Sequence, residues 1–207
     1  MKAKFIFIFL LTIIFFGCVK SDDTNMLISI DRKLNSGQYD DAIQEGEKYV
    51  QDYPGSYKGW NLLGWAYLKT DNLKKAEQCF SKSISINDES DNAYVGKGVL
   101  YRKMNRLDQA KQSYLKAISI VPRNAEAYSS MLVIELMEGN DKKAVEYGEK
   151  AWAIRKDLPS IPANLAIAYH YLGEPEKRDE FYKLAEDLGY HNMQAIEDII
   201  NGKTSIR

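Results

Sequence analysis

The stretch WNLLGWAY, residues 60–67, decides the fold. It repeats large residues and a glycine at spacings of three and four, the spacing of one helix face: Trp60, Leu63, Gly64 and Tyr67. A small residue inside such a face is expected where a second helix approaches closely. The stretch therefore predicts one half of a packed helix pair.

A shift of 34 residues reproduces this pattern along the chain. The first shift reaches Tyr94, Gly98 and Tyr101, and two more shifts reach Ala166 and Tyr169. The register does not slip at any step. Five units therefore tile the chain without a gap: 23–56, 57–90, 91–124, 125–158 and 159–192.

Each unit contains two stretches of helical periodicity separated by a turn signal. The five turn signals are Ser36-Gly37, Asp71-Asn72, Asn105, Gly139-Asn140-Asp141 and Gly173-Glu174-Pro175. Beyond the fifth unit, Met193, Ile196, Ile199 and Ile200 line one side of a last helix, which Asn201-Gly202 should end.

These residues resemble the tetratricopeptide repeat, whose period is 34 and whose signature is W-x₂-L-G-x₂-Y…A-x₃-F…P. The resemblance covers Asp23 to about Asn192. It implies an all-α fold, an α-solenoid of tandem helix hairpins with a concave groove. Residues 193–207 are expected to form a C-terminal capping helix and tail, because the end of a solenoid needs a polar outer face.

Two units exchange residue sizes. Position 8, counted from the first residue of a unit, is small in the second, third and fifth units, and position 24 there is aromatic: Phe80, Tyr114 and Tyr182. The first unit instead pairs Ile30 with Gly46, and the fourth pairs Leu132 with Gly148. Because a packed core tolerates exchanges that conserve volume, both units are interpreted as true repeats in which these pairs touch.

The N-terminal residues have a different character. Two lysines precede an apolar run over residues 5–16, about 12 residues where a membrane-spanning helix needs roughly 20. Phe15 does not suit an ordinary signal-peptidase site, which leaves cleavage between Gly17 and Cys18. The end of the run resembles the lipobox of bacterial lipoproteins, although Phe15 stands where leucine is usual. Residues 1–17 are therefore expected to be a signal peptide, and 18–24 a Cys18 carrying diacylglycerol plus a short tether, before the repeats over 25–192.

Composition and motifs argue against several functional classes. The chain carries 28 basic and 29 acidic side chains without a basic cluster, which disfavours nucleic acid. His170 and His191 lack partners at metal-ligand spacing, and Gly96-Lys97-Gly98 lies in a helical unit, where a nucleotide loop is not expected. Cys79 is expected to be a small core residue. We therefore expect no enzyme activity, no cofactor, no metal and no small-molecule substrate.

The sequence as a whole predicts a non-enzymatic protein-interaction scaffold of the bacterial cell envelope. Cys18 would hold it on the periplasmic or outer-surface side of a membrane, and its expected partner is a protein or peptide of the envelope or membrane. An alternative is a cytoplasm-facing chaperone-like or regulatory module held by an uncleaved N-terminal anchor.

The resemblance also implies where the partner lies. Positions 2, 5, 9 and 12 of each first helix cluster away from its self-packing positions, and in the repeat family they line the groove. Position 9 is apolar in four successive units, either as part of a site or as packing between first helices. The expected groove residues are Lys58, Asn61, Trp65, Leu68, Asn92, Val95, Val99, Arg102, Val133, Leu136, Ile167 and His170.

We expect Cys18→Ser to release the protein from membranes or to leave the uncleaved precursor, because the thiol would carry the acyl groups. Incorporation of a fatty-acid analogue, mature mass and membrane partitioning report the change. A variant that keeps wild-type size, label and partitioning would contradict the lipoprotein assignment.

Overall fold

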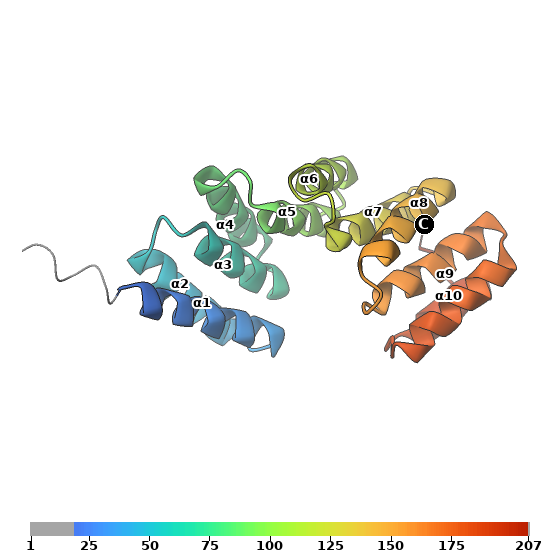
Figure 1. Ribbon diagram of the computed structural model, residues 1–207, viewed down its shortest axis with the longest axis horizontal. Coiled ribbons are helices and arrows are strands. Elements are labelled where there is room, and N and C mark those ends of the chain that lie inside the picture. Colours follow the sequence, from blue (N-terminus) through green and yellow to red (C-terminus); the bar gives the residue numbers. More distant parts are fainter. Residues whose placement is uncertain (1–18, 207) are drawn as a thin grey trace, which may run out of the picture.

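The computed structural model describes residues 19–206, a range that consists of helices and turns (Figure 1). The expected signal peptide and Cys18 lie outside the described residues. Within residues 19–206, no helix combines the length and apolarity needed to span a bilayer. The helices are α1 Val19–Asn35, α2 Tyr39–Asp52, α3 Tyr57–Lys69, α4 Leu73–Ile86, α5 Asp91–Lys103, α6 Leu107–Ile120, α7 Ala125–Met137, α8 Asp141–Ile154, α9 Ser160–Leu172, α10 Pro175–Asp187 and α11 Met193–Ile200.

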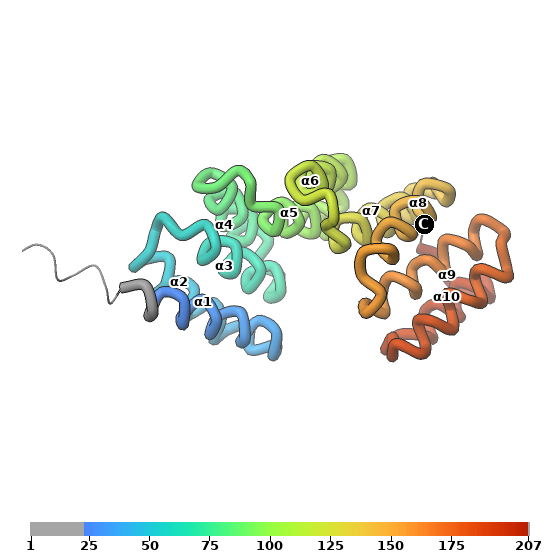
Figure 2. The backbone as a smooth tube through the Cα atoms, viewed as in Figure 1, coloured from blue at the N-terminus to red at the C-terminus, as the bar shows by residue number. Residues whose placement is uncertain are grey.

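The first ten helices form five hairpins that follow one another along the long axis of the molecule, as the backbone trace shows (Figure 2). The two ends of the array bend to the same side, which gives an arch (Figure 1). Each first helix contacts its own second helix, the second helix of the preceding hairpin and the neighbouring first helices. The first helices α1, α3, α5, α7 and α9 thus form a continuous inner layer, and the second helices form the outer layer. The helix α11 packs on α9, as expected of a cap.

The start of α1 corrects one expectation. The segment from Val19 to Thr24 is helical, whereas the sequence was expected to give a short tether there. Asp23 explains part of the difference, because the hydroxyl of buried Tyr49 on α2 donates a hydrogen bond to its carboxylate. The first turns of α1 are thereby attached to the hairpin.

The turn inside every hairpin has the same geometry. Position 15 of each unit adopts a positive φ, between 57° at Asn105 and 78° at Gly173. The next residue donates its backbone N–H to the carbonyl five residues back, as Arg106 does to Tyr101 at 2.8 Å. This closure satisfies carbonyls at the helix end, and it needs residues that tolerate left-handed backbone. Glycine, aspartate and asparagine occupy the position, at Gly37, Asp71, Asn105, Gly139 and Gly173.

Large side chains lie directly against glycines of the first helices. A Cβ atom built on Gly64 would lie 2.8 Å from the ring of Phe80, and one on Gly98 would lie 2.4 Å from the ring of Tyr114. The predicted pairing of positions 8 and 24 is therefore confirmed in these two units. Phe80 also covers Gly96 of the next hairpin, where a Cβ would lie 2.3 Å from its ring.

The exchanged units are confirmed in part. At Gly148, a Cβ would lie 2.3 Å from Leu132, as expected, but also 2.5 Å from Leu165 of the next hairpin. At Gly46, the three nearest atoms all belong to Leu63, so the following hairpin supplies the closest contact instead of Ile30.

The fifth unit departs from the pattern as well. Phe181 is buried and stacks on Tyr169, whereas Tyr182 is half-buried and donates a hydrogen bond to Glu197 of α11 at 2.7 Å. This bond raises the pKa of Tyr182 to about 12. Position 24 of the fifth unit therefore binds the capping helix α11 instead of filling its own hairpin.

Gly98→Ala should lower the free energy of unfolding by about 1–2 kcal/mol, because overfilling a packed site costs more than the better helix propensity of alanine returns. Urea unfolding followed by circular dichroism measures the change. Gly55→Ala is the matched control, since its new Cβ meets nothing within 4 Å, and it should change stability by less than about 0.5 kcal/mol. Equal effects of the two substitutions would contradict the close contact.

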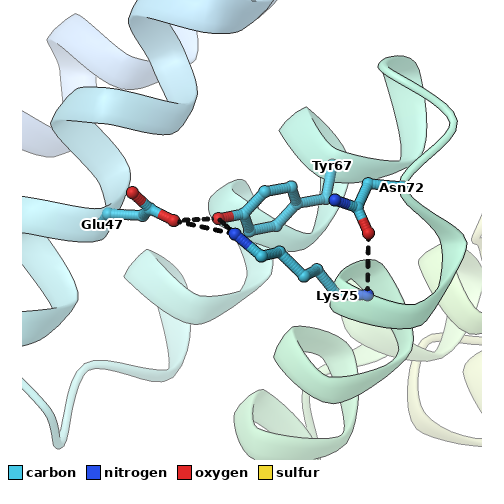
Figure 3. A network of polar contacts seen from close by, with 4 residues as sticks. All are labelled: Glu47, Tyr67, Asn72 and Lys75. Carbon is cyan, nitrogen blue, oxygen red and sulfur yellow. Dashed lines mark hydrogen bonds and ion pairs between the residues drawn. The ribbon is translucent and has the colours of Figure 1, made fainter.

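Position 11 links each later hairpin to the one before it. Figure 3 shows the first such link, in which the hydroxyl of Tyr67 donates to Glu47 of α2 and Lys75 donates to that hydroxyl at 3.0 Å. The hydrogen bond from Tyr67 keeps the pKa of Glu47 below its usual value. The other links are Tyr101 to Glu77 at 3.1 Å, Lys111 to Glu135 at 3.1 Å and Tyr169 to Glu149 at 2.6 Å.

Tyr67→Phe should destabilise the protein by about 0.5–1 kcal/mol at pH 7, the usual net value of one hydrogen bond. Because the pKa of Glu47 is lowered in the folded state, the contribution of its charge is present above the ordinary glutamate value of about 4.3 and is lost as the pH falls below it. The difference from wild type should therefore shrink at about pH 3, as measured by urea unfolding at both pH values.

Tyr94→Phe provides the control, because the Tyr94 hydroxyl makes no hydrogen bond with the residues that the structure describes. A Tyr67→Phe difference that is the same at both pH values, or no larger than that of Tyr94→Phe, would contradict the link.

Candidate functional site

The concave face of the arch is made by the first helices, because neighbouring first helices contact one another while the second helices lie outside them. A pocket of about 420 Å³ opens between α1, α3 and the start of α5. Its lining comes from three hairpins: Thr24, Leu27, Ile28, Asp31, Tyr57, Lys58, Asn61, Leu62, Asn87, Glu89, Ser90, Asp91 and Asn92.

The pocket combines an apolar wall with an acidic rim. Ile28 on α1 is 50% exposed, and Leu27 and Leu62 beside it are half-buried. Asp31 on α1 and Glu89 just before α5 are exposed carboxylates of the lining.

Asn61 supplies a buried acceptor. Its Oδ1 atom is enclosed and has no hydrogen-bond partner among the residues of the described chain. A buried amide oxygen without a partner loses free energy that a donor would restore. A ligand N–H group in this pocket would meet that need.

The structure brings together three of the predicted groove residues in this pocket, namely Lys58, Asn61 and Asn92. The groove positions also exist in the first unit, which the sequence prediction did not include. Positions 2, 5 and 9 of that unit are Thr24, Leu27 and Asp31, and all three line the pocket. Asp31 occupies position 9, which is apolar in the other four units.

Four predicted groove residues lie in the core instead. Leu68, Val95, Leu136 and Ile167 are at most 5% exposed, because the first helices pack closely enough to cover them. Helical spacing places these residues on the correct side of the helix but does not report the distance to the next helix. They therefore support the groove from beneath and cannot contact a partner.

The remaining position-9 residues are half-buried. Trp65 packs its ring edge-to-face on Phe80, with centroids 5.7 Å apart, and Val99 and Val133 continue the row. The sequence left open whether these side chains pack between helices or are exposed. Each of the three packs on the core and remains partly accessible.

Arg102 lies further along the groove, half-buried on α5. Its Nε atom is enclosed beside the hydroxyl of Tyr114, which interacts with Arg102 and Ser130. Burial raises the pKa of Tyr114. Because an arginine fork matches the geometry of a carboxylate, Arg102 can hold an acidic group of a ligand.

His170 is the last predicted groove residue. It is half-buried on α9, and burial lowers its pKa, with a smaller effect from Arg178.

A second pocket of about 450 Å³ lies between α2, α3 and α4 and contains Cys79. Burial raises the pKa of the Cys79 thiol to about 12, so the reactive thiolate is disfavoured. Cys79 is 5% exposed, as expected of a core residue. Within residues 19–206, no group of three histidine, cysteine or acidic side chains is arranged for a metal ion.

Comparison with known proteins identifies the repeat. Models of the family described as "Tetratricopeptide repeat" match residues 57–90 and 91–124, the second and third units with the same boundaries. The human mitochondrial import receptor subunit TOM70 is 29% identical over 123 residues, which are 59% of this chain and 20% of the receptor. The chain thus spans about a fifth of the length of the curated relatives that it matches.

Two solved structures have a similar arrangement of helices. PilF of Pseudomonas aeruginosa has a TM-score of 0.77 at 16% identity, over 89% of this chain and 85% of that chain. PilW, described as a widely conserved type IV pilus biogenesis factor, has a TM-score of 0.76 at 16% identity, over 88% and 86%. At these identities the likeness shows the fold alone. Residues 57–124 thus match the tetratricopeptide-repeat family, and the hairpins on both sides continue the same solenoid of paired helices.

Proposed function

We propose that this protein is an interaction scaffold of the bacterial cell envelope that binds a protein partner along its concave face and is attached to a membrane through a lipidated Cys18. The observation that carries the partner site is the groove itself. It places the accessible apolar side chains of Leu27, Ile28 and Leu62 beside Asn61, whose amide oxygen has no hydrogen-bond partner among the described residues. Such a surface is stabilised by a ligand that supplies the missing partners.

Membrane attachment is supported by the short apolar run that ends at Gly17-Cys18, and it stays a proposal. The structural likeness to PilW favours a role in assembling an envelope complex, such as a type IV pilus. We propose this role as an analogy of fold, since one fold serves many functions. The cytoplasm-facing alternative predicts an uncleaved leader and no lipid on Cys18, so the Cys18→Ser experiment separates the two.

A photocrosslinking residue in place of Lys58 should capture the partner in native membranes, because Lys58 is exposed and lines the groove. The same residue in place of Lys74, which is exposed on the outer helix α4, is the matched control and should not capture it.

Trp65→Ala and Arg102→Glu should each weaken this capture about tenfold, because anchors of these two residue types contribute much of the energy of a binding surface. Circular dichroism and membrane partitioning should stay as in wild type. Capture from position 74 that survives both substitutions would place the partner on the outer layer and contradict the groove assignment.

A further inference from the structure

We propose that the pocket between α1, α3 and α5 takes a partner segment that carries a basic side chain, lysine or arginine, next to an apolar one. This inference rests on the proposed function and names the chemistry of the partner at one end of the groove. It follows from the charge of the lining, from the apolar wall and from the buried acceptor of Asn61.

The lining is negative. Asp31, Glu89 and Asp91 face one base, Lys58. Within the part of the chain that the structure describes, none of the three carboxylates forms an ion pair, although Asp31 accepts a hydrogen bond from Asn35 at 3.2 Å and Asp91 accepts one from Asn124 at 2.9 Å. Because a hydrogen bond from an amide leaves the charge in place, the pocket keeps its negative potential.

Two of these carboxylates lie at a helix N-terminus, where acidic residues are common, and the third does not. Asp91 is the first residue of α5 and Glu89 lies just before its N-cap Ser90, at the helix end where acidic side chains complement the dipole. Asp31 is in the body of α1, at position 9, which is apolar in the four following units. Its presence there adds a third charge to the same pocket from a different hairpin.

The apolar wall of the pocket favours an apolar side chain in the partner segment, next to the basic one. Ile28 is 50% exposed, the most exposed large hydrophobic side chain that the structure describes. Leu27 and Leu62 lie beside it in the lining. An aliphatic stem of lysine or a neighbouring leucine would cover this wall while the cation reaches the acidic rim.

The buried oxygen of Asn61 completes the selection. It can only accept a hydrogen bond, so it favours an N–H donor, which a peptide backbone, lysine or arginine supplies. An acidic peptide could also donate a backbone N–H to this oxygen, but its carboxylates would bring like charge to the rim, and so would an anionic lipid headgroup. The occupant is therefore a cationic protein segment.

The test uses the mature protein in phosphatidylcholine nanodiscs and two labelled peptides. One carries leucine and lysine, and its counterpart has glutamate in place of each lysine. Fluorescence anisotropy should show binding of the lysine peptide and at least tenfold weaker binding of the glutamate peptide. Affinity for the lysine peptide should fall between about 0.05 M and 0.5 M salt, because salt screens exposed charges.

Asp31→Lys and Glu89→Lys should each weaken the lysine peptide about tenfold. Asp88→Lys changes the net charge equally but is not part of the lining, so it should leave the affinity within about twofold. Ile28→Ser, at an exposed site, should weaken binding without unfolding the array.

Three results would overturn the proposal: no binding of the lysine peptide, equal binding of both peptides, or the same loss from Asp88→Lys as from Asp31→Lys. Crosslinking from position 58 distinguishes a failure of this proposal from a failure of the proposed scaffold function. If a partner is captured there through a segment without a basic residue, the scaffold role stands and the charge assignment fails.

Discussion

The contact between a ring and a glycine backbone is the constraint on which the array depends. Phe80 leaves room for no side chain at either Gly64 of its own hairpin or Gly96 of the next. One side chain therefore sets two distances, the width of a hairpin and its separation from the following hairpin. Leu132 and Leu165 perform the same task together around Gly148. Since the core is filled in this way from both neighbours, a hairpin has no complete core of its own, and the repeats stabilise one another.

Features that depend on nearby residues could be predicted from the sequence. The period of 34, the turns at position 15 and the last helix all follow from residues a few places apart, and the structure has them where expected. Features that depend on neighbouring hairpins could not. A sequence period does not show which hairpin fills the space at Gly46, and Leu63 of the next one does so. Nor does helical spacing show that Val95 and Ile167 are covered, because burial depends on the distance between helices.

The distinctive chemistry of the groove comes from positions where the repeat departs from its own pattern. Asp31 stands at position 9, which is apolar in the other four units, and Arg102 stands at position 12, which is leucine in the first, second and fourth units. Asp31 is exposed and Arg102 is half-buried, and both lie on first helices, which form the concave side. The repeats thus build the surface, and these departures from the pattern place a carboxylate on the first hairpin and a guanidinium group on the third.

The stacking of each hairpin only on its neighbours has a mechanical consequence. Within residues 19–206, extensive contacts join only neighbouring hairpins, so the curvature of the arch is the sum of small rotations at the interfaces between them. A rotation of a few degrees at each interface adds up to a large displacement of the ends while every local contact is kept. The solenoid should therefore be elastic and able to open or close around a partner at a low cost in free energy. The partner would then set the radius of the arch, and tension applied to one end would be transmitted to the site at the other.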